Sequence, residues 1–334
     1  LKKPPLSLDG LYLFIRIRIS KIKNNRDMIQ YLKCDNGFKE TEQYDSSCWI
    51  NVVNPTKDDI NELVSHFNTP DYFYEDISDI DERPRFDRDD GWILTIIRVP
   101  NRVRTEDNQD PIYTTIPLGM MLKDNILITV YYGQNNVISN FINWSNQKKI
   151  NRAGYDLYIS IFLESNFWYL KYLKQIHLQM KKAESSLSDK MNKSELMHIM
   201  NIEKFLVYFT ASLKDNESVL TRAKRFIPTK SYDEDLMDDV EVELSQALHT
   251  SQIYSDILER EQSSYSSIIN NSLNQTMKKM TIITICLMVA ALVPGFYGMN
   301  LTNGMEDWIY GFPFALCLTG VCAGIAYYLC KLFK

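Results

Sequence analysis

The sequence predicts an α+β protein in which a cytosolic α/β domain is followed by long stalk helices and two transmembrane α-helices. Three observations support this prediction. Strand and helix patterns alternate in the first half, helical patterns alone follow from about residue 151, and two long apolar segments stand near the C-terminus. The 334 residues suffice for a sizeable soluble domain plus a membrane part, and the 45% of hydrophobic residues is near the globular average.

Charge and cysteine usage exclude several classes of function. The formal net charge of −5 argues against a nucleic-acid partner, which requires a basic face. The six cysteines include no CxxC pair and indicate reduced thiols rather than a disulfide framework. The four histidines show no metal or triad spacing, and neither a nucleophile elbow nor a GxxxxGK[ST] motif is present. We therefore expect neither an enzyme nor an ATP-driven pump, and no organic cofactor.

The first segment, residues 1–27, is basic and is interpreted as an N-terminal extension, either non-native or disordered. Its apolar residues are interrupted by Arg16 and Arg18, which is unlike a signal peptide. The stretch LFIRIRIS alternates with period two, so an edge strand is the alternative.

Residues 28–150 are predicted to form the cytosolic α/β domain. CWINVVNP at 48–55 indicates a strand, and KDDINELVSHF at 57–67 has the apolar spacing of a helix. GWILTIIRVP at 91–100 and YTTIPLGMMLKDNILITVYYG at 113–133 indicate further strands, the second with a hairpin turn at KDN.

Residues 151–230 are predicted to be an antiparallel helical pair with a turn near Asn192, ended by Pro228. Residues 231–299 then form one stalk helix, which contains no proline or glycine before its last six residues. Its final part, about 280–299, has no charged residue and is long enough to cross a bilayer.

A second apolar span at 308–330 follows the connection 300–307, and a basic tail closes the chain at 331–334. Two lysines precede the first span at 278–279, whereas the connection has two acids and no base. Because positive residues stay inside, we expect a multi-pass membrane protein with both termini cytoplasmic and an extracytoplasmic loop.

The motif YGMN at Tyr297–Asn300 ends the first span and resembles the signature of the CorA family of magnesium transporters. NQTMKKMTIITICLMVAALVPGFYGMN resembles the family's pore helix, and YEDISDIDERPRFDRDDGWILTII resembles its cytosolic ED…RP+ segment followed by a strand. The order of elements also agrees from about Met28 onward. The resemblance implies a homopentamer with a funnel-shaped cytosolic part in the cell (inner) membrane, and transport of Mg²⁺ with Co²⁺ and Ni²⁺ as further substrates.

Two spans in one chain cannot enclose a water path, so conduction requires several copies, with the first span lining the axis. On a helix of 100° per residue, Asn274, Met277 and Met288 fall within about 60° of one another. The resemblance assigns them to the pore, together with Ala291 and Gly295, and the methionines form a constriction that can gate by dewetting. Lipid or helix packing is the alternative for a methionine in a span. Ala291 departs from the threonine common in the family, which leaves the choice among Mg²⁺, Co²⁺, Ni²⁺ and Zn²⁺ open.

The selectivity filter is predicted at Tyr297, Gly298, Met299 and Asn300. Mg²⁺ sheds its waters reluctantly, and neutral amide and carbonyl oxygens accept hydrogen bonds from those waters without stripping them. Gly298 lets the backbone turn, and Tyr297 packs at the interface. Glu306 and Asp307 in the connection either attract cations or are merely solvated.

The resemblance also implies regulation by cytosolic Mg²⁺ bound between subunits. Glu75 and Asp76 match the family's ED pair, and Asp239 matches its opposing acid; Glu164 and Asn166 lie near a third ligand that cannot be assigned. Carboxylates repel one another without a bound ion, so Mg²⁺ bridges would hold the pore closed.

The membrane potential alone is then sufficient to drive passive uptake of the cation. A Zn²⁺-transporting relative of the same fold is one alternative. A membrane-tethered helical scaffold without ion flux is the alternative from a different class.

Overall fold

The computed structural model describes residues 29–42, 48–103, 111–187, 193–299 and 308–332. The chain divides into two compact units after Leu258, and each unit is treated separately below. The division falls inside a single helix, so the domain boundaries expected from sequence stay predictions. The N-terminal extension, the turn near Asn192, and the site residues Asn300, Glu306 and Asp307 lie outside the described residues.

The first unit is built on one seven-stranded mixed sheet with the order β2-β1-β3-β7-β6-β5-β4. Among the strands that the structure describes, only β3 and β7 pair in parallel, with Ile50 opposite Ile128; the other pairs are antiparallel. The strands are β1 (Ile29–Cys34), β2 (Phe38–Thr41), β3 (Cys48–Val53), β4 (Arg85–Asp89), β5 (Trp92–Val103), β6 (Ile112–Lys123) and β7 (Ile126–Tyr131). The expected hairpin is confirmed, because Lys123 pairs with Ile126 across a two-residue turn.

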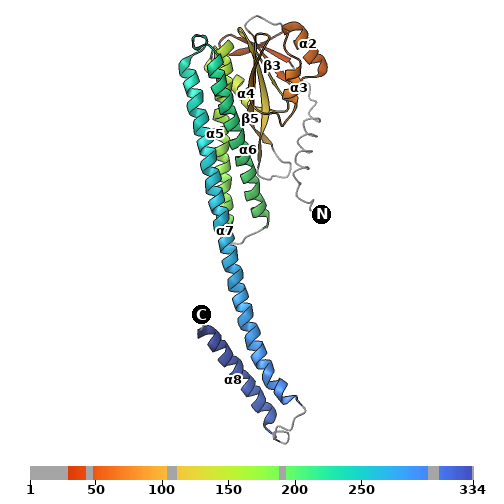
Figure 1. Ribbon diagram of the computed structural model, residues 1–334, viewed down its shortest axis with the longest axis vertical. Coiled ribbons are helices and arrows are strands. Elements are labelled where there is room, and N and C mark those ends of the chain that lie inside the picture. Colours follow the sequence, from red (N-terminus) through yellow and green to blue (C-terminus); the bar gives the residue numbers. More distant parts are fainter. Residues whose placement is uncertain (1–28, 43–47, 104–110, 188–192, 300–307, 333–334) are drawn as a thin grey trace. The chain divides into compact units, whose positions relative to one another are not determined.

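Helices cover both faces of this sheet (Figure 1). On one face lie α2 (Lys57–Phe67) and α3 (Tyr72–Ser78), whose buried residues join Ile50, Val52 and Met121 in one apolar cluster. Thr56 caps α2 in a capping box with Asp59, which fixes the start of the helix where the sequence predicts it. The other face is covered by α4 (Asn136–Lys148) and by two longer helices. The predicted α+β class is therefore confirmed.

The two longer helices are α5 (Gly154–Leu187) and α6 (Lys193–Phe226), which pack against each other and against β5 and β6. The buried Asn216 of α6 is bonded to both backbone groups of Arg98 in β5: its Oδ1 accepts from the Arg98 amide at 2.9 Å, and its Nδ2 donates to the Arg98 carbonyl at 2.8 Å. Buried aromatic residues of α5 pack against α6: the rings of Tyr169 and Phe209 meet edge-on with their centroids 5.0 Å apart.

The next helix, α7 (Glu234–Tyr297), is unbroken over 64 residues. Within the first unit its buried positions recur every three or four residues in a single stripe that includes Leu236, Val240, Leu244 and Ala247. The helix begins three residues after the start of the predicted 231–299 segment and ends two residues before its end, where Gly298 is in a turn.

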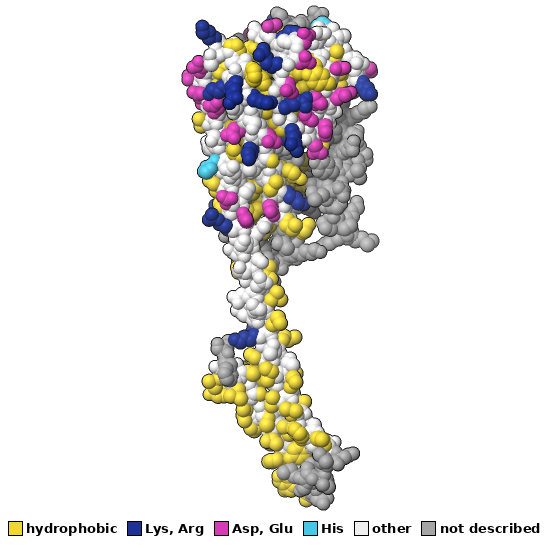
Figure 2. Space-filling view, in the orientation of Figure 1, with side chains coloured by type: hydrophobic (Ala, Val, Ile, Leu, Met, Phe, Trp, Pro, Cys, Tyr) yellow, Lys and Arg dark blue, Asp and Glu magenta, His cyan; other side chains and the backbone are white. Residues whose placement is uncertain are grey.

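The second unit contains the rest of α7 and α8 (Gly311–Leu332). Both helices include a stretch long and apolar enough to cross a membrane. Figure 2 shows mainly hydrophobic side chains along the described surface of these segments. The second helix begins three residues later than the predicted span, because Trp308–Tyr310 form a turn in which the Gly311 amide donates to the Trp308 carbonyl at 2.8 Å.

Several elements carried too weak a periodicity to be predicted. They are the hairpin of β1 and β2, the edge strand β4 and the short helices α3 and α4. Their burial depends on partners far away in the chain, as shown by Phe38 of β2, whose ring meets Trp49 and Phe141 at 5.0 and 5.9 Å.

Candidate ion pathway and regulatory acids

The residues predicted to line a pore lie along one face of α7 in the second unit, and all are exposed in the single chain. We call them the pore face: Asn274, Met277, Met288, Ala291 and Gly295. Exposure alone does not distinguish this face. The exposed fraction is 66% for Met277 and 64% for Met288, but it is also 66% for Leu287, which points elsewhere.

The half-buried residues of the same segment show which way the pore face points relative to α8. They form one stripe made of Ile282, Cys286, Val289, Ala290, Val293 and Tyr297. The only other helix that the structure describes in this unit is α8, which lies alongside this part of α7 in Figure 1. At 100° per residue, the pore face points roughly 150° away from this stripe. Within one chain, α8 therefore leaves the pore face uncovered.

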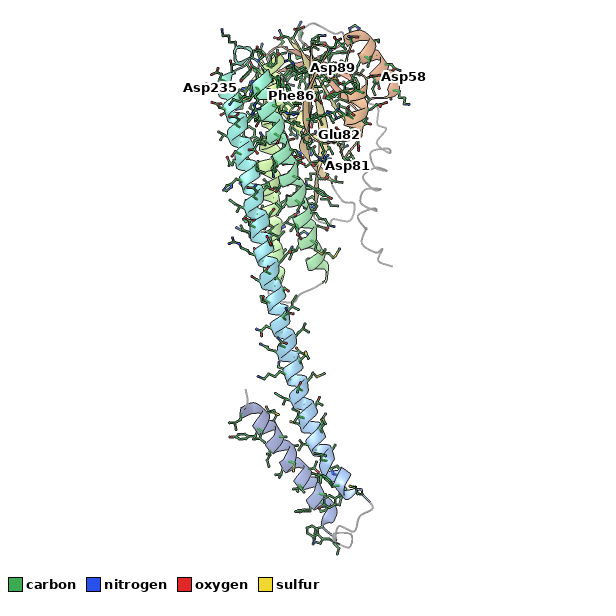
Figure 3. The ribbon with its side chains drawn as sticks, in the orientation of Figure 1. Asp58, Asp81, Glu82, Phe86, Asp89 and Asp235 are labelled. Atoms are coloured by element: carbon green, nitrogen blue, oxygen red, sulfur yellow. The ribbon has the colours of Figure 1, made fainter. Side chains whose placement is uncertain are left out.

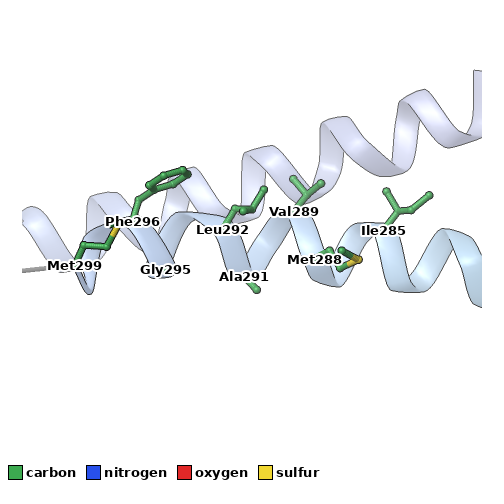
Figure 4. Close-up of a pocket in the computed structure, with 8 residues that line it drawn as sticks. All are labelled: Ile285, Met288, Val289, Ala291, Leu292, Gly295, Phe296 and Met299. Carbon is green, nitrogen blue, oxygen red and sulfur yellow. The ribbon is translucent and has the colours of Figure 1, made fainter.

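A shallow groove runs along α7 between the pore face and the stripe that contains Val289, and Figure 4 shows its lining residues. Met288, Ala291, Gly295 and Met299 are among its lining residues, which are all apolar. Gly295 borders open space in the single chain, since a Cβ atom added there would meet nothing within 4 Å. A groove of apolar side chains provides no ligand for a bare ion, so it is suited to a constriction rather than to a binding site.

The end of α7 carries the part of the predicted filter that the structure describes. The Gly298 amide donates to the Pro294 carbonyl at 2.9 Å, and the Met299 amide donates to the Phe296 carbonyl at 3.4 Å. Gly298 lies in a turn, but its φ is not in the left-handed region. A Cβ atom there would lie 3.2 Å from the Pro294 carbonyl oxygen, so glycine is favoured by a close approach rather than by a positive φ.

Two threonines that sequence reasoning missed lie on or beside the pore face. The hydroxyl of Thr281 donates to the Met277 carbonyl at 2.8 Å, and that of Thr284 donates to the Met280 carbonyl at 2.9 Å. Each hydroxyl oxygen keeps a lone pair that can accept a hydrogen bond from a hydrated ion. Helical spacing from Asn274 was the signal that could have found them.

The predicted regulatory acids Glu75 and Asp76 lie on α3. Asp71 caps this helix, and Phe73, Tyr74 and Ile77 fix it on the sheet because all three are buried. The remaining positions of this short helix face outward, which leaves Glu75 exposed and Asp76 half-buried. Close approach to the sheet requires Gly119 of β6, where an added Cβ would overlap the Ile77 side chain.

Asp76 is not a free ligand, because its carboxylate is paired with Arg85 of β4. The same guanidinium reaches Glu82 Oε1 at 2.5 Å and Asp87 Oδ2 at 2.9 Å. Burial raises the pKa of Glu82 above its usual range, and Arg85 opposes part of this rise. Arg85 belongs to the RP+ part of the sequence motif, but sequence reasoning did not connect it with Asp76.

The third predicted regulatory acid, Asp239, is exposed near the start of α7. Figure 3 shows Asp235, in the first turn of the same helix, well apart from Asp81 and Glu82, which follow α3. Among the described residues, no group of three His, Cys, Asp or Glu side chains is placed to hold a metal ion. One chain therefore does not bring Glu75 and Asp76 together with Asp239.

The structure also gives contacts for the two residues near the unassigned third ligand. Glu164 accepts a hydrogen bond from Trp168 Nε1 at 2.9 Å, and burial raises the pKa of its carboxyl group. Asn166 is fully buried and donates to the Val240 carbonyl at 3.3 Å. Asn166 is thus a packing residue between α5 and α7 in this structure. Its side chain does not lie on the surface where Asp239 is exposed.

Comparison with known proteins identifies the family. The family model of the CorA-like Mg²⁺ transporter protein matches residues 44–331, so this chain belongs to that family. The cobalt/magnesium transport protein CorA of Methanocaldococcus jannaschii is 27% identical over 261 residues, 76% of this chain and 80% of that protein. The magnesium transport protein CorA of Helicobacter pylori is 23% identical over 304 residues, 86% of this chain and 89% of that protein.

A solved structure of a protein from the same family has a similar fold. The complete structure of the CorA magnesium transporter from Methanocaldococcus jannaschii superposes with a TM-score of 0.78 at 23% sequence identity, covering 92% of this chain and 98% of that chain. The predicted membership in the CorA family is therefore confirmed.

Proposed function

We propose that this protein conducts hydrated divalent cations, Mg²⁺ first among them, across a membrane through an axis lined by α7. The observation that carries the proposal is the direction of the pore face, which points about 150° away from the stripe of α7 that faces α8. A chain of the CorA family with such an uncovered face is suited to meet other copies of itself around an axis.

The proposed assembly is a homopentamer in the cell (inner) membrane, with both termini cytoplasmic. Five copies of Asn274 stand at the cytosolic mouth, Met277 and Met288 narrow the path, and Tyr297–Asn300 form the outer filter. Neutral oxygens there accept hydrogen bonds from the waters of Mg²⁺, which the ion releases reluctantly. Glu306 and Asp307 are proposed to raise the cation concentration near the entrance.

The proposed driving force is the membrane potential. A dication that moves inward gains roughly 4–5 kcal/mol per 100 mV, twice the value for a single charge. This gain is sufficient for passive uptake, and an apolar constriction along the groove of α7 provides a gate that opens by wetting.

Ion flux into liposomes tests this function. The purified full chain is reconstituted, and Mg²⁺ entry is followed with an internal dye. We expect uptake that increases with an inside-negative potential and is reduced by Co²⁺ and Ni²⁺. Protein-free liposomes are the control. Absence of flux for every dication would favour the membrane-tethered scaffold, and uptake of Zn²⁺ in preference to Mg²⁺ would favour the zinc-transporting alternative.

We further propose that cytosolic Mg²⁺ regulates the pore from a site between subunits, with Glu75 and Asp76 on one subunit and Asp239 on the next. Support comes from the exposure of Glu75 and Asp239 and from their separate positions in one chain. A bridging ion would join the α3 side of one subunit to α7 of its neighbour and hold the helix in a closed position. When the ion leaves, the carboxylates repel one another, the bridge between the two subunits is lost and the pore opens.

Neutralising the three acids should weaken the protection of the cytosolic part by Mg²⁺ against a protease. The variant is Glu75→Gln, Asp76→Asn and Asp239→Asn in one chain. We expect the Mg²⁺ concentration for half-maximal protection to rise about tenfold or more, because each lost carboxylate removes a charged oxygen ligand. Limited proteolysis across a Mg²⁺ series measures this shift.

A matched control removes the same charge elsewhere: Asp58→Asn, Asp215→Asn and Glu217→Gln, all exposed in the first unit. The control should keep normal protection by Mg²⁺. Equal shifts in both variants would indicate a general charge effect and would exclude the proposed site.

A further inference from the structure

The ion-pair cluster around Arg85 suggests how the proposed regulation is tuned. Arg85 lies on the edge strand β4, and its side chain is 30% exposed. The guanidinium is paired with Asp76 of α3, with Glu82 of the following loop, and with Asp87 of its own strand. A group with five N–H donors in a fixed fork can serve several carboxylates at once, which an ammonium group does less well.

The backbone of the loop that carries Glu82 is held in place independently of Arg85. Arg98 of β5 donates through Nη1 to the carbonyl of Ile80 at 2.9 Å and to that of Glu82 at 3.0 Å. Its Nη2 donates to the Thr115 carbonyl at 2.9 Å, so the loop after α3 is fixed to the sheet. Since α3, which carries Asp76, is held separately by its buried residues, loss of the Arg85 side chain would leave the backbone at Asp76 and Glu82 near its present position.

The carboxylate of Asp76 has two mutually exclusive uses. Coordination of a dication and pairing with a guanidinium both require its oxygens and both neutralise its charge. Arg85 already holds one of those oxygens, and its other contacts keep it beside Asp76. An incoming Mg²⁺ must replace this contact or share it against the repulsion of a positive charge.

We propose that Arg85 is a tethered cation that competes with Mg²⁺ for Asp76 and so raises the Mg²⁺ concentration at which the regulatory site fills. This inference rests on the proposed sensor function of Asp76. Arg85 acts by positioning and charge and is not itself a metal ligand. Because half of the Asp87 side chain is exposed, at 49%, the guanidinium can turn toward solvent and Asp87 when Mg²⁺ takes Asp76.

The test is the Mg²⁺ dependence of protease protection in the full chain, measured for Arg85→Gln. We expect half-maximal protection at a Mg²⁺ concentration about three- to fivefold lower than in the unaltered protein, which is the range for losing one partly exposed ion pair. The matched control is Arg88→Gln, which removes the same charge from the exposed end of the same strand. The control should shift the midpoint less than about twofold.

An unchanged or higher midpoint in Arg85→Gln would overturn the proposal, as would equal shifts in Arg85→Gln and Arg88→Gln. If Arg85→Gln does not fold, as judged by thermal unfolding without metal, Arg85→Lys replaces it in the test. Lysine keeps the positive charge but not the forked donors of the guanidinium. The midpoint of Mg²⁺ protection should then fall by a smaller factor than in Arg85→Gln, and an unchanged or higher midpoint would overturn the proposal. Lack of any Mg²⁺ protection in the unaltered protein would instead reject the sensor itself, together with this inference, and liposome flux would still test transport separately.

Discussion

Replacement of Asn300 by alanine is expected to reduce Mg²⁺ transport by at least about tenfold. In the proposed pentamer the change removes five amide oxygens at the outer end of the path. A hydrogen bond to a charged group contributes about 1.5–3 kcal/mol, and 1.4 kcal/mol corresponds to a factor of ten. Since a hydrated dication carries its charge into its water shell, losing the acceptors of that shell weakens entry. Mg²⁺ flux into liposomes at a fixed potential measures the effect.

The chain supplies its own control for this variant. Asn303 belongs to the same connection but lies outside the YGMN motif, and Asn303→Ala removes an identical group. We expect this control to transport Mg²⁺ at nearly the normal rate. Normal rate and normal selectivity in Asn300→Ala would exclude Asn300 from the filter and would leave the rest of the α7 pathway to be tested by other variants.

Helical periodicity predicts which residues share the pore face but not where that face points. Positions on an unbroken helix follow from a rotation of 100° per residue, so the common face of Asn274, Met277 and Met288 was accessible from sequence. The direction of that face was not, because it depends on which residues of α7 meet α8. The half-buried stripe through Ile282 and Val289 supplies it.

The contacts of the regulatory acids, by contrast, could not be predicted from the sequence. Glu75 and Asp76 were found through a motif, but their surroundings depend on contacts that no local pattern reveals. Asp76 pairs with Arg85 nine residues away across a loop, and the helix that carries both acids rests on Gly119 of a strand more than forty residues later. Short elements such as α3 are formed mainly by tertiary packing, which explains why their periodicity did not predict them.

Gly119→Ala is expected to lower the free energy of unfolding by about 1–3 kcal/mol, the usual range for overpacking a core. Gly119 lies in β6, paired with Ile96 on one side and Val130 on the other, so the strand cannot move away. An added Cβ would lie 2.6 Å from Ile77 Cγ1 and 3.3 Å from Phe73 Cε1. Both neighbours are fully buried, and α3 must shift to make room.

The double variant Gly119→Ala with Ile77→Ala separates this clash from a general loss of stability. Ile77→Ala alone leaves a cavity and should cost about 2–5 kcal/mol. In the double variant the new methyl group occupies space that Ile77 has vacated, so the combined loss should be smaller than the sum by about 0.5–3 kcal/mol. Thermal or denaturant unfolding of the four proteins of the cycle measures this difference. Additive losses would show that Gly119 does not determine how α3 packs on the sheet. A coupled loss, together with weaker Mg²⁺ protection in Gly119→Ala alone, would show that the position of Glu75 and Asp76 depends on the absence of a side chain at Gly119.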